Sequence, residues 1–442
     1  MPSRLNELRA LMPVGEGTIL AADVIMPSMT DDVLHGNRAL SAAFGSDLLT
    51  DYVPDALGAA DVRRQLASGQ LPTNDGPLEV GQLRVPLARR VESIPVTSCA
   101  ARARMLVLTE QALTVHTPRP EVFSYRSLRW QYRPAYQARQ SRLRALATRQ
   151  DLPLVLVLDV HRFGRSLPLD TLIGKPWMTE RLAEALTDLH AATGRCLLPG
   201  HRWSNRLATA SLAPLDDTIA ALAPDRWVRW GDDIHIFTRD QNEADDIRAA
   251  AVLALDRIGL RLSEEKSTVI AAASVLAGPA RFLAGRPEEV WRTGLEAGDV
   301  TALRYALSRT PPDRTVSLTL VDAVRDRPVL LPRAAHYLDR AAQTPEGQAA
   351  AKRLLHTAET DAFAAARLLA LTGRRPELVS EVPDGLLAVA ARSGFVSLRE
   401  LAFQIEVLRH HRDARPPTSR MRDWLRADGF LRRQRPQVST LL

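Results

Sequence analysis

Val228-Arg229-Trp230-Gly231-Asp232-Asp233-Ile234 is the stretch of this sequence that decides its fold. Residues 227–230 and 234–237, on either side, alternate apolar and polar side chains with a period of two, which predicts two half-buried strands. Gly231 allows a tight turn between them, so that both Asp side chains can reach one face of the hairpin tip. Two adjacent carboxylates at such a turn could bind divalent cations, but the turn alone is common in proteins without a metal site. A metal site would require a further carboxylate from another strand.

A further carboxylate lies 73 residues before Asp232, at the end of an apolar run. Residues 154–158 are continuously apolar, as in a central strand, and Asp159 follows them. Two divalent cations about 4 Å apart need carboxylates from separate strands to bridge them. Asp159 and Asp232 can supply this bridge if the two strands belong to one sheet.

Other short motifs occur in a set order around these acids. They are RVESIP (90–95), Arg102, FSYR (123–126), LPGHRWSNRLA (198–208), GLRLSEEKST (259–268) and FLA (282–284). In this order they resemble the reverse-transcriptase motifs RPLGIP, the DR pair, YGFR, LPQGxxxSxxLA, GLxLxxxKT and the FLG of the primer grip. The resemblance covers roughly residues 85 to 285, and six ordered matches carry more weight than any single one.

The resemblance implies an α+β fold with the fingers and palm of a right-hand, reverse-transcriptase-like polymerase, followed by an all-α C-terminal domain. Residues 1–80 are expected to form an N-terminal extension, 81–158 the fingers, 159–290 the palm and 291–442 a thumb-like helical domain. From about residue 290, short amphipathic segments alternate with Pro and Gly stops, which favours stacked helical hairpins of the solenoid type. This part resembles the helical C-terminal extensions of bacterial abortive-infection and other defence-associated reverse transcriptases.

Catalytic roles follow from the same resemblance. Asp159 and Asp232 would bridge two Mg²⁺ ions, with Mn²⁺ as an alternative, while Asp233 and the backbone of Val160 would complete the metal site. Lys266, one of only three lysines in the chain, would protonate pyrophosphate or stabilise its charge. A solvated loop lysine is the competing interpretation of Lys266.

The resemblance also implies contacts with nucleotide and nucleic acid. The expected nucleotide-binding residues are Arg90, Val160, Phe163, Gly164, Gly200 and Ser204. The expected nucleic-acid contacts are Arg102, Tyr125, Arg126 and Trp230. Arg90 would hold the incoming triphosphate, and Gly200 and Ser204 would begin the helix that carries the template.

Several positions depart from the family pattern. Trp230 stands where Tyr is usual, and Pro199 replaces a Gln near the template and nucleotide. Gly164 occupies the position of an aromatic residue that excludes a 2′-hydroxyl, although Phe163 could rotate into that role. Sugar selectivity is therefore open, and ribonucleotides could be accepted. Asp216 and Asp217 are expected to be structural, as a helix cap or as ion-pair partners.

Aromatic and arginine residues are interleaved between residues 125 and 149. They include Trp130, Tyr132 and Tyr136 together with Arg126, Arg129, Arg133, Arg139, Arg142 and Arg144. Aromatic rings could stack bases while guanidinium groups hold a phosphate backbone, as in single-strand channels. A solvated helix with ordinary core aromatics is an equally good interpretation.

Composition agrees with these expectations. The 442 residues suggest two or three domains, and the net charge of +7 favours a polyanionic partner. No apolar run is long enough to span a membrane, so no membrane partner is expected. Cys99 and Cys196 are too few for a disulfide framework, which favours the cytoplasm.

The expected function is addition of dNTPs to a 3′-hydroxyl or a protein hydroxyl, templated by RNA or untemplated, in bacterial antiphage defence. The expected partners are an RNA template or associated non-coding RNA, the DNA product, dNTPs, and a second copy or a partner defence protein. Two alternatives stay open. One is a weakly catalytic nucleic-acid-binding and signalling protein on the same fold, and the other is an RNA-synthesising polymerase, for which Gly164 is the argument.

Overall fold

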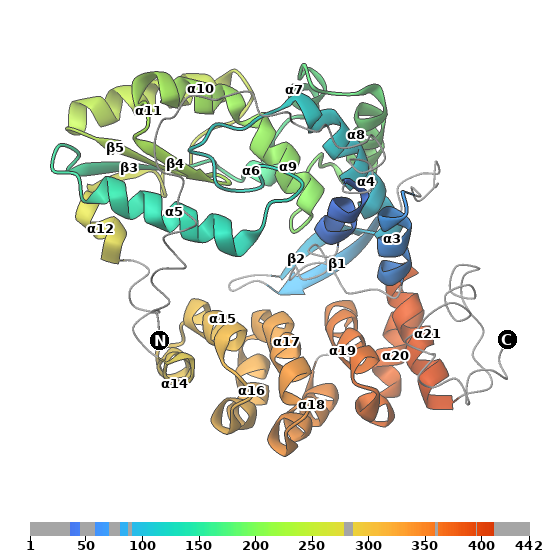
Figure 1. Cartoon of the computed structure of the whole chain (residues 1–442). Coiled ribbons are helices and arrows are strands. Elements are labelled where there is room, and N and C mark those ends of the chain that lie inside the picture. Colours follow the sequence, from blue (N-terminus) through green and yellow to red (C-terminus); the bar gives the residue numbers. More distant parts are fainter. Residues whose placement is uncertain are drawn as a thin grey trace, which may run out of the picture.

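The computed structural model describes residues 36–44, 58–69, 80–86, 91–277, 286–358, 361–394 and 396–410. These residues form a mixed α+β protein with two small antiparallel sheets and a helical C-terminal region. The larger sheet and its helices form the upper part of Figure 1, and the C-terminal helices form a row below them. Arg90 and residues 282–284 lie outside the described residues, so their expected roles stay predictions.

The larger sheet has four strands in the order β4-β5-β3-β6, and all neighbours are antiparallel. The strands are β3 (Leu154–Asp159), β4 (Trp227–Trp230), β5 (Asp233–Thr238) and β6 (Thr268–Ala271). Helices follow β3, a hairpin comes next, and one long helix precedes β6, which gives a β-α-β-β-α-β sequence of elements. The apolar run 154–158 lies in β3, one of the two inner strands, as its composition predicts.

Helices cover both faces of this sheet. Those between β3 and β4 are α6 (Phe163–Ser166), α7 (Leu169–Ile173), α8 (Glu180–Thr193), α9 (Arg202–Ser211) and α10 (Ala213–Leu222). The other helices around the sheet are α4 (Cys99–Ala112), η1 (Leu113–Val115), α5 (Tyr132–Ala147), α11 (Gln241–Asp256) and α12 (Ala272–Ala277). Figure 1 shows α10 and α11 above the sheet and α5 below it.

The two faces of β3 contribute to two different cores. Leu156 and Leu158 belong to the large core that also contains residues of α8 to α11, whereas Val155 packs with Leu143 of α5. Because side chains alternate along a strand, Asp159 lies on the same side as Val155. The sheet therefore presents Asp159 on the α5 side.

The smaller sheet is the hairpin of β1 (Val80–Pro86) and β2 (Val91–Thr97). Its inward side chains, Leu83, Val85, Ile94 and Val96, are buried in the core of the C-terminal helices. By contrast, α3 (Gly58–Ala67) packs on α4, in the core of the larger sheet. The hairpin in the expected fingers thus shares its core with the C-terminal region.

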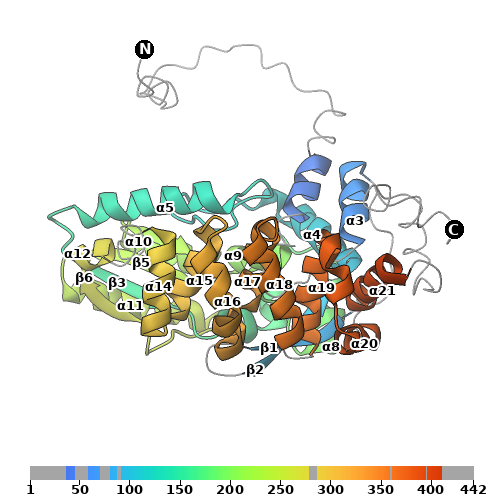
Figure 2. The ribbon, with the colours of Figure 1, turned by 90° about the horizontal axis from the view of Figure 1, so that it is seen from below.

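The C-terminal region is helical throughout its described residues. Its elements are α14 (Pro287–Ala297), α15 (Val300–Arg309), α16 (Arg314–Asp326), η2 (Pro328–Leu330), α17 (Leu331–Ala341), α18 (Pro345–Thr357), α19 (Ala362–Arg374), η3 (Pro376–Glu381), α20 (Asp384–Ala391) and α21 (Val396–His410). Alternate helices pack on each other: α15, α17, α19 and α21 form one layer, and α14, α16 and α18 another (Figures 1 and 2). Successive helix pairs in helical-repeat domains build a continuous core in this way.

Capping side chains set where these helices begin. Asp299, Asp313, Thr344 and Asp361 each accept a hydrogen bond from a backbone N–H in the first turn of α15, α16, α18 and α19. Such caps satisfy N–H groups that have no partner within the helix. No helix in the described part of the chain is long and apolar enough to cross a membrane.

Gly347 of α18 lies against the end of α17. A Cβ at this position would lie only 2.0 Å from the carbonyl oxygen of Ala341. We expect Gly347→Ala to force the two helices apart and to lower the free energy of unfolding by about 2 kcal/mol, since overpacking a tight contact costs that much. Urea unfolding followed by circular dichroism measures the change. Gly394→Ala is the control, because a Cβ there meets nothing within 4 Å, and equal midpoints for both variants would contradict the prediction.

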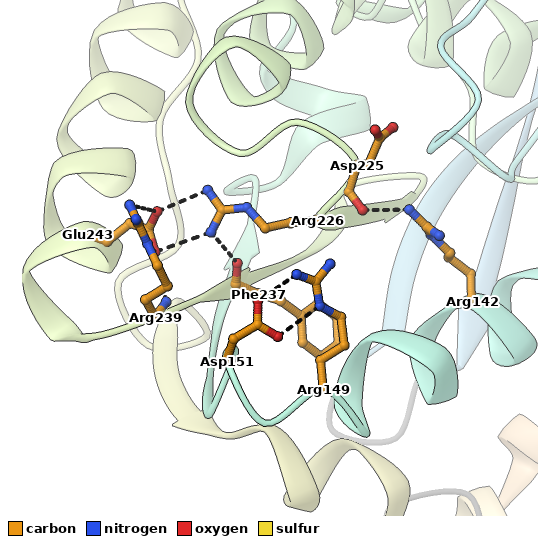
Figure 3. A network of polar contacts seen from close by, with 8 residues as sticks. All are labelled: Arg142, Arg149, Asp151, Asp225, Arg226, Phe237, Arg239 and Glu243. Atoms are coloured by element: carbon orange, nitrogen blue, oxygen red, sulfur yellow. Dashed lines mark hydrogen bonds and ion pairs between the residues drawn. The ribbon is translucent and has the colours of Figure 1, made fainter.

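Charged groups tie the far end of the larger sheet to its helices (Figure 3). Arg226, just before β4, donates to both carboxylate oxygens of Glu243 on α11, at 2.9 and 3.2 Å. Arg239 donates to the same carboxylate at 2.9 Å. Arg142 of α5 donates to the carbonyl oxygen of Asp225. These contacts join α5, α11 and the sheet at the end opposite to the β4–β5 turn.

Acid is expected to weaken this network. Burial opposes ionisation of Glu243, but hydrogen bonds from Arg226 and Arg239 lower its pKa from 4.5 to about 2. The stabilisation is therefore complete above pH 4.5 and is lost as the pH falls from 4.5 through 2. We expect Glu243→Gln to lower the free energy of unfolding by about 2 kcal/mol at pH 7 and by clearly less at pH 3. Urea midpoints at both pH values, with exposed Glu264→Gln as control, test this; a deficit independent of pH would contradict it.

Candidate active site

The β4–β5 hairpin places two carboxylates at the end of the sheet. Trp230 pairs with Asp233, so Gly231 and Asp232 form a two-residue loop. Gly231 has a φ of +65°, and no positive φ is found at Asp232. A positive φ at the first loop residue alone is the pattern of a type II′ turn, which strongly favours Gly there. The tight turn predicted from the sequence is present.

Carboxylates from two adjacent strands meet beside this turn. Asp159, the last residue of β3, pairs directly with Asp233, the first residue of β5. Directly opposed residues of antiparallel strands project from the same face, and like charges in this position repel. The pKa of Asp232 is raised by burial and by the charges of Asp233 and Asp159, and that of Asp233 by burial and by Asp159. The end of the sheet thus concentrates negative charge.

Lys266 forms an ion pair with Asp159. Its Nζ lies 3.2 and 3.1 Å from the two carboxylate oxygens of Asp159, and this hydrogen bonding raises the pKa of Lys266. The segment that carries Lys266 is fastened to the end of β3: the N–H of Ser263 donates to the carbonyl oxygen of Asp159 at 2.8 Å, and Ser267 Oγ accepts from the N–H of Asp159 at 3.3 Å. The GLRLSEEKST motif therefore delivers its lysine to the carboxylates.

Arg139 of α5 supplies a second positive charge, which the sequence motifs did not assign to the site. Its guanidinium carbon lies 6.0 Å from the ring centroid of Trp230, the residue before the turn. Its charge opposes the rise in the pKa of Asp233. The only sequence signal for it was its place in the cluster of arginines and aromatics.

A buried ion pair supports the turn from the opposite face of the sheet. Arg229 is fully buried and donates to both oxygens of Asp216 at 2.7 and 2.6 Å. It also donates to the carbonyl oxygen of Gly231 at 2.9 Å, while Ser124 Oγ accepts from the N–H of Gly231 at 2.7 Å. Both backbone groups of Gly231 are therefore held. The prediction that Asp216 is structural is confirmed, whereas the roles of Arg229 and Ser124 were not predicted.

Polar groups of the loop before α9 form hydrogen bonds within the loop itself. Gly200 has a φ of +78°, which explains the need for glycine there. Ser204 is 3% exposed, and its Oγ accepts from the N–H of Leu198 at 2.9 Å. This position does not support the expected nucleotide contact of Ser204, because its hydroxyl is buried and closes the loop.

His201, at the start of α9, connects this loop to the β1–β2 hairpin. Its Nδ1 lies 3.1 Å from the carbonyl oxygen of Pro199, and its Nε2 lies 3.1 Å from Thr97 Oγ1. Since a carbonyl only accepts, Nδ1 carries the proton and Nε2 accepts from Thr97. Burial and the charge of Arg102 lower the pKa of His201 to about 3, so it is neutral at pH 7. Sequence patterns gave no signal for this contact.

Arg102 and Phe163 lie in the interior rather than at a binding surface. Arg102 has no exposed surface, and its guanidinium lies 5.6 Å from the ring centroid of Phe44. Phe163 is 6% exposed and belongs to the core of the larger sheet. Burial therefore does not support nucleic-acid contact by Arg102 or a nucleotide contact by the side chain of Phe163. Gly164, the next residue, is exposed.

Tyr125, Arg126 and Val160 lie around the turn. The ring of Tyr125 stacks on Trp130 with 4.2 Å between centroids, and Trp130 lies 5.8 Å from Trp230. Arg126 lines a pocket of about 680 Å³ next to Trp130. Val160 forms an isolated bridge with Leu262, whose two hydrogen bonds use the N–H of His161 and the carbonyl of Asp159. The carbonyl oxygen of Val160 takes part in neither of these two hydrogen bonds.

The oxygen atoms near the turn are of the chemical type that binds divalent cations. Asp159, Asp232, Asp233 and the Val160 carbonyl offer the hard oxygen ligands that Mg²⁺ prefers. A cation would relieve the repulsion that helps to raise the pKa values of Asp232 and Asp233. Within the described residues, no cluster of three or more His, Cys, Asp or Glu side chains is arranged to hold a metal ion. Lys266 must leave Asp159 before a metal can take both of its oxygens.

Comparison of the sequence with known proteins assigns no family to the chain. No protein-family model matches the chain, and no curated protein sequence matches it.

Proposed function

We propose that the protein is a nucleotidyltransferase of the reverse-transcriptase type that adds dNTPs to a 3′-hydroxyl or a protein hydroxyl. The observation that carries the proposal is the meeting of three motifs far apart in the sequence. Asp159 from β3, the Asp232–Asp233 pair from the hairpin, and Lys266 from the segment before β6 lie together at one end of the sheet. Two-metal nucleotidyl transfer requires such oxygen ligands from separate strands.

The chain's own residues have distinct tasks in this proposal. Asp159 and Asp232, with Asp233 and the Val160 carbonyl, would hold two Mg²⁺ ions. When bound, these ions would lower the pKa of the attacking hydroxyl and neutralise the triphosphate. Lys266, released from Asp159, would reach the leaving pyrophosphate and hold its negative charge.

The surrounding fold supports this assignment. The β-α-β-β-α-β sequence of elements matches the strand, helix, hairpin and closing strand expected for a palm. We also propose that the enzyme acts in bacterial antiphage defence, in the cytoplasm. For the defence role, the helical character of α14 to α21 agrees with the C-terminal extension expected from the sequence. The net charge of +7 favours binding of RNA and DNA.

One observation favours synthesis of RNA as a second candidate. Gly164 is exposed, and a Cβ there would meet nothing within 4 Å. Phe163, the neighbouring aromatic residue, points into the core. Neither residue provides a side chain that would exclude a 2′-hydroxyl, so rNTPs compete with dNTPs under this alternative.

Nucleotide incorporation by the purified full-length protein tests both candidates. Labelled dNTPs and rNTPs are supplied separately with Mg²⁺, with and without RNA, and co-purified nucleic acid is retained. Incorporation of dNTPs that is lost in Asp232→Asn/Asp233→Asn supports the proposal, and preferential use of rNTPs supports the second candidate. No incorporation of either kind would overturn both and leave a binding protein.

A further inference from the structure

Two tyrosines on α5, the first exposed and the second half-buried, form a stack beside the candidate active site. Tyr132 and Tyr136 are one helical turn apart, and their rings are nearly parallel, with an interplanar angle of 6° and centroids 5.8 Å apart. Tyr132 is 60% exposed, which is unusual for a large aromatic side chain. We call Tyr132, Tyr136 and Arg139 the α5 ladder. Tyr132, the first residue of the α5 ladder, is open to solvent.

The α5 ladder is anchored on the turn that carries the carboxylates. The ring of Trp230 is nearly perpendicular to those of Tyr132 and Tyr136, with centroid distances of 5.4 and 5.8 Å. The guanidinium of Arg139 lies over the same indole. Because Trp230 immediately precedes the Gly231–Asp232 turn and all three residues of the α5 ladder lie within 6.0 Å of its ring centroid, the α5 ladder lies beside the candidate active site.

Positive charge surrounds the α5 ladder. α5 contains four arginines and no acidic residue, and Arg133 and Arg144 are exposed. The C-terminal helices add Arg309, at the end of α15, and Arg333 on α17, whose charges both act on the hydroxyl of Tyr132. Figures 1 and 2 show α5 next to the row of C-terminal helices. Charge complementarity therefore favours a polyanion here.

We propose that the α5 ladder, together with Arg309 and Arg333, binds single-stranded nucleic acid. Exposed rings accept any unpaired base, whereas bases within a duplex are already stacked on each other. Arg309 and Arg333 would hold the phosphates of the strand whose bases stack on Tyr132. The direction of the strand relative to the active site rests on the proposed function, but the binding itself does not.

Fluorescence anisotropy with labelled oligo(dT), oligo(U) and a duplex of equal length, in EDTA and without nucleotides, tests this surface. We expect Tyr132→Ala to weaken binding of the single strands about tenfold, since stacking of one base contributes that much. Tyr132→Phe keeps the ring and should bind as the wild type does. Oligo(dT) and oligo(U) together show whether DNA or RNA is preferred.

The arginines are tested by salt dependence. Arg309→Ala/Arg333→Ala should reduce the slope of log Kd against log salt by roughly 0.7 for each phosphate that the protein no longer neutralises. Arg181→Ala, an exposed arginine of α8, is the control and should leave the slope unchanged. Urea midpoints confirm that each variant is folded. Wild-type affinity in Tyr132→Ala together with an unchanged slope in the double variant would overturn the proposal, as would tighter binding of the duplex than of either single strand.

The two proposals can fail separately. If the variants change single-strand binding as expected but the protein incorporates no nucleotide, the proposed function is rejected and the binding surface is retained. If the protein incorporates nucleotides but substitutions at Tyr132, Arg309 and Arg333 leave its binding of single strands unchanged, the proposed function is retained and the proposed binding surface is rejected.

Discussion

Asp159→Asn is expected to reduce nucleotide incorporation by about 10³-fold or more, the scale seen when a group that stabilises developing charge is removed. Asp159 is the only one of the three acids that lies outside the β4–β5 hairpin, and it pairs directly with Asp233. An amide keeps the shape of the side chain but removes the negative charge that would hold a cation. Initial rates of dNTP incorporation at saturating Mg²⁺ measure the loss.

Two further measurements show whether the loss reflects chemistry. Asp188→Asn changes an exposed acid on α8 in the same manner and should retain the wild-type rate. Direct titration with Mn²⁺, followed by its electron paramagnetic resonance signal, should show weaker metal binding in Asp159→Asn. A variant that incorporates nucleotides at the wild-type rate would exclude Asp159 from the reaction.

Arg229→Met is expected to lower the free energy of unfolding by about 3–5 kcal/mol, because it leaves the carboxylate of Asp216 buried without its partner. Arg229 is fully buried and makes two hydrogen bonds to Asp216. The midpoint of urea unfolding followed by circular dichroism gives the change. A loss below about 1 kcal/mol, within the range of an exposed ion pair, would contradict the prediction.

A double variant separates the stability of this pair from its effect on the turn. Arg229→Met/Asp216→Leu replaces the whole ion pair by apolar side chains and should recover most of the lost stability, since such replacements are often neutral. It cannot restore the hydrogen bond from Arg229 to the carbonyl oxygen of Gly231. We therefore expect the double variant to remain slow in incorporation although it is stably folded. Full recovery of the rate would show that Arg229 does not position the turn.

The candidate site was predictable where its residues occur in short local patterns. Asp159 ends an apolar run, and Asp232 follows a glycine in a hairpin, so local periodicity located both. Lys266 was located by the motif around it. Ser204 and Arg102 were assigned by the same kind of matching, but burial removes both side chains from solvent. A motif identifies a position in the chain, whereas burial depends on what packs over it.

By itself, the sequence determined the local elements of this protein: the apolar central strand, the hairpin with its positive-φ Gly231, and capped helix starts such as those at Thr344 and Asp361. These depend on interactions within a few residues, which periodicity and turn chemistry report. Only the tertiary structure decided that Arg229 pairs with Asp216 and that the β1–β2 hairpin packs against the C-terminal helices. Such pairings join segments distant in the chain, and the free energy that selects them comes from burial and desolvation of the assembled whole, which no short stretch of sequence encodes.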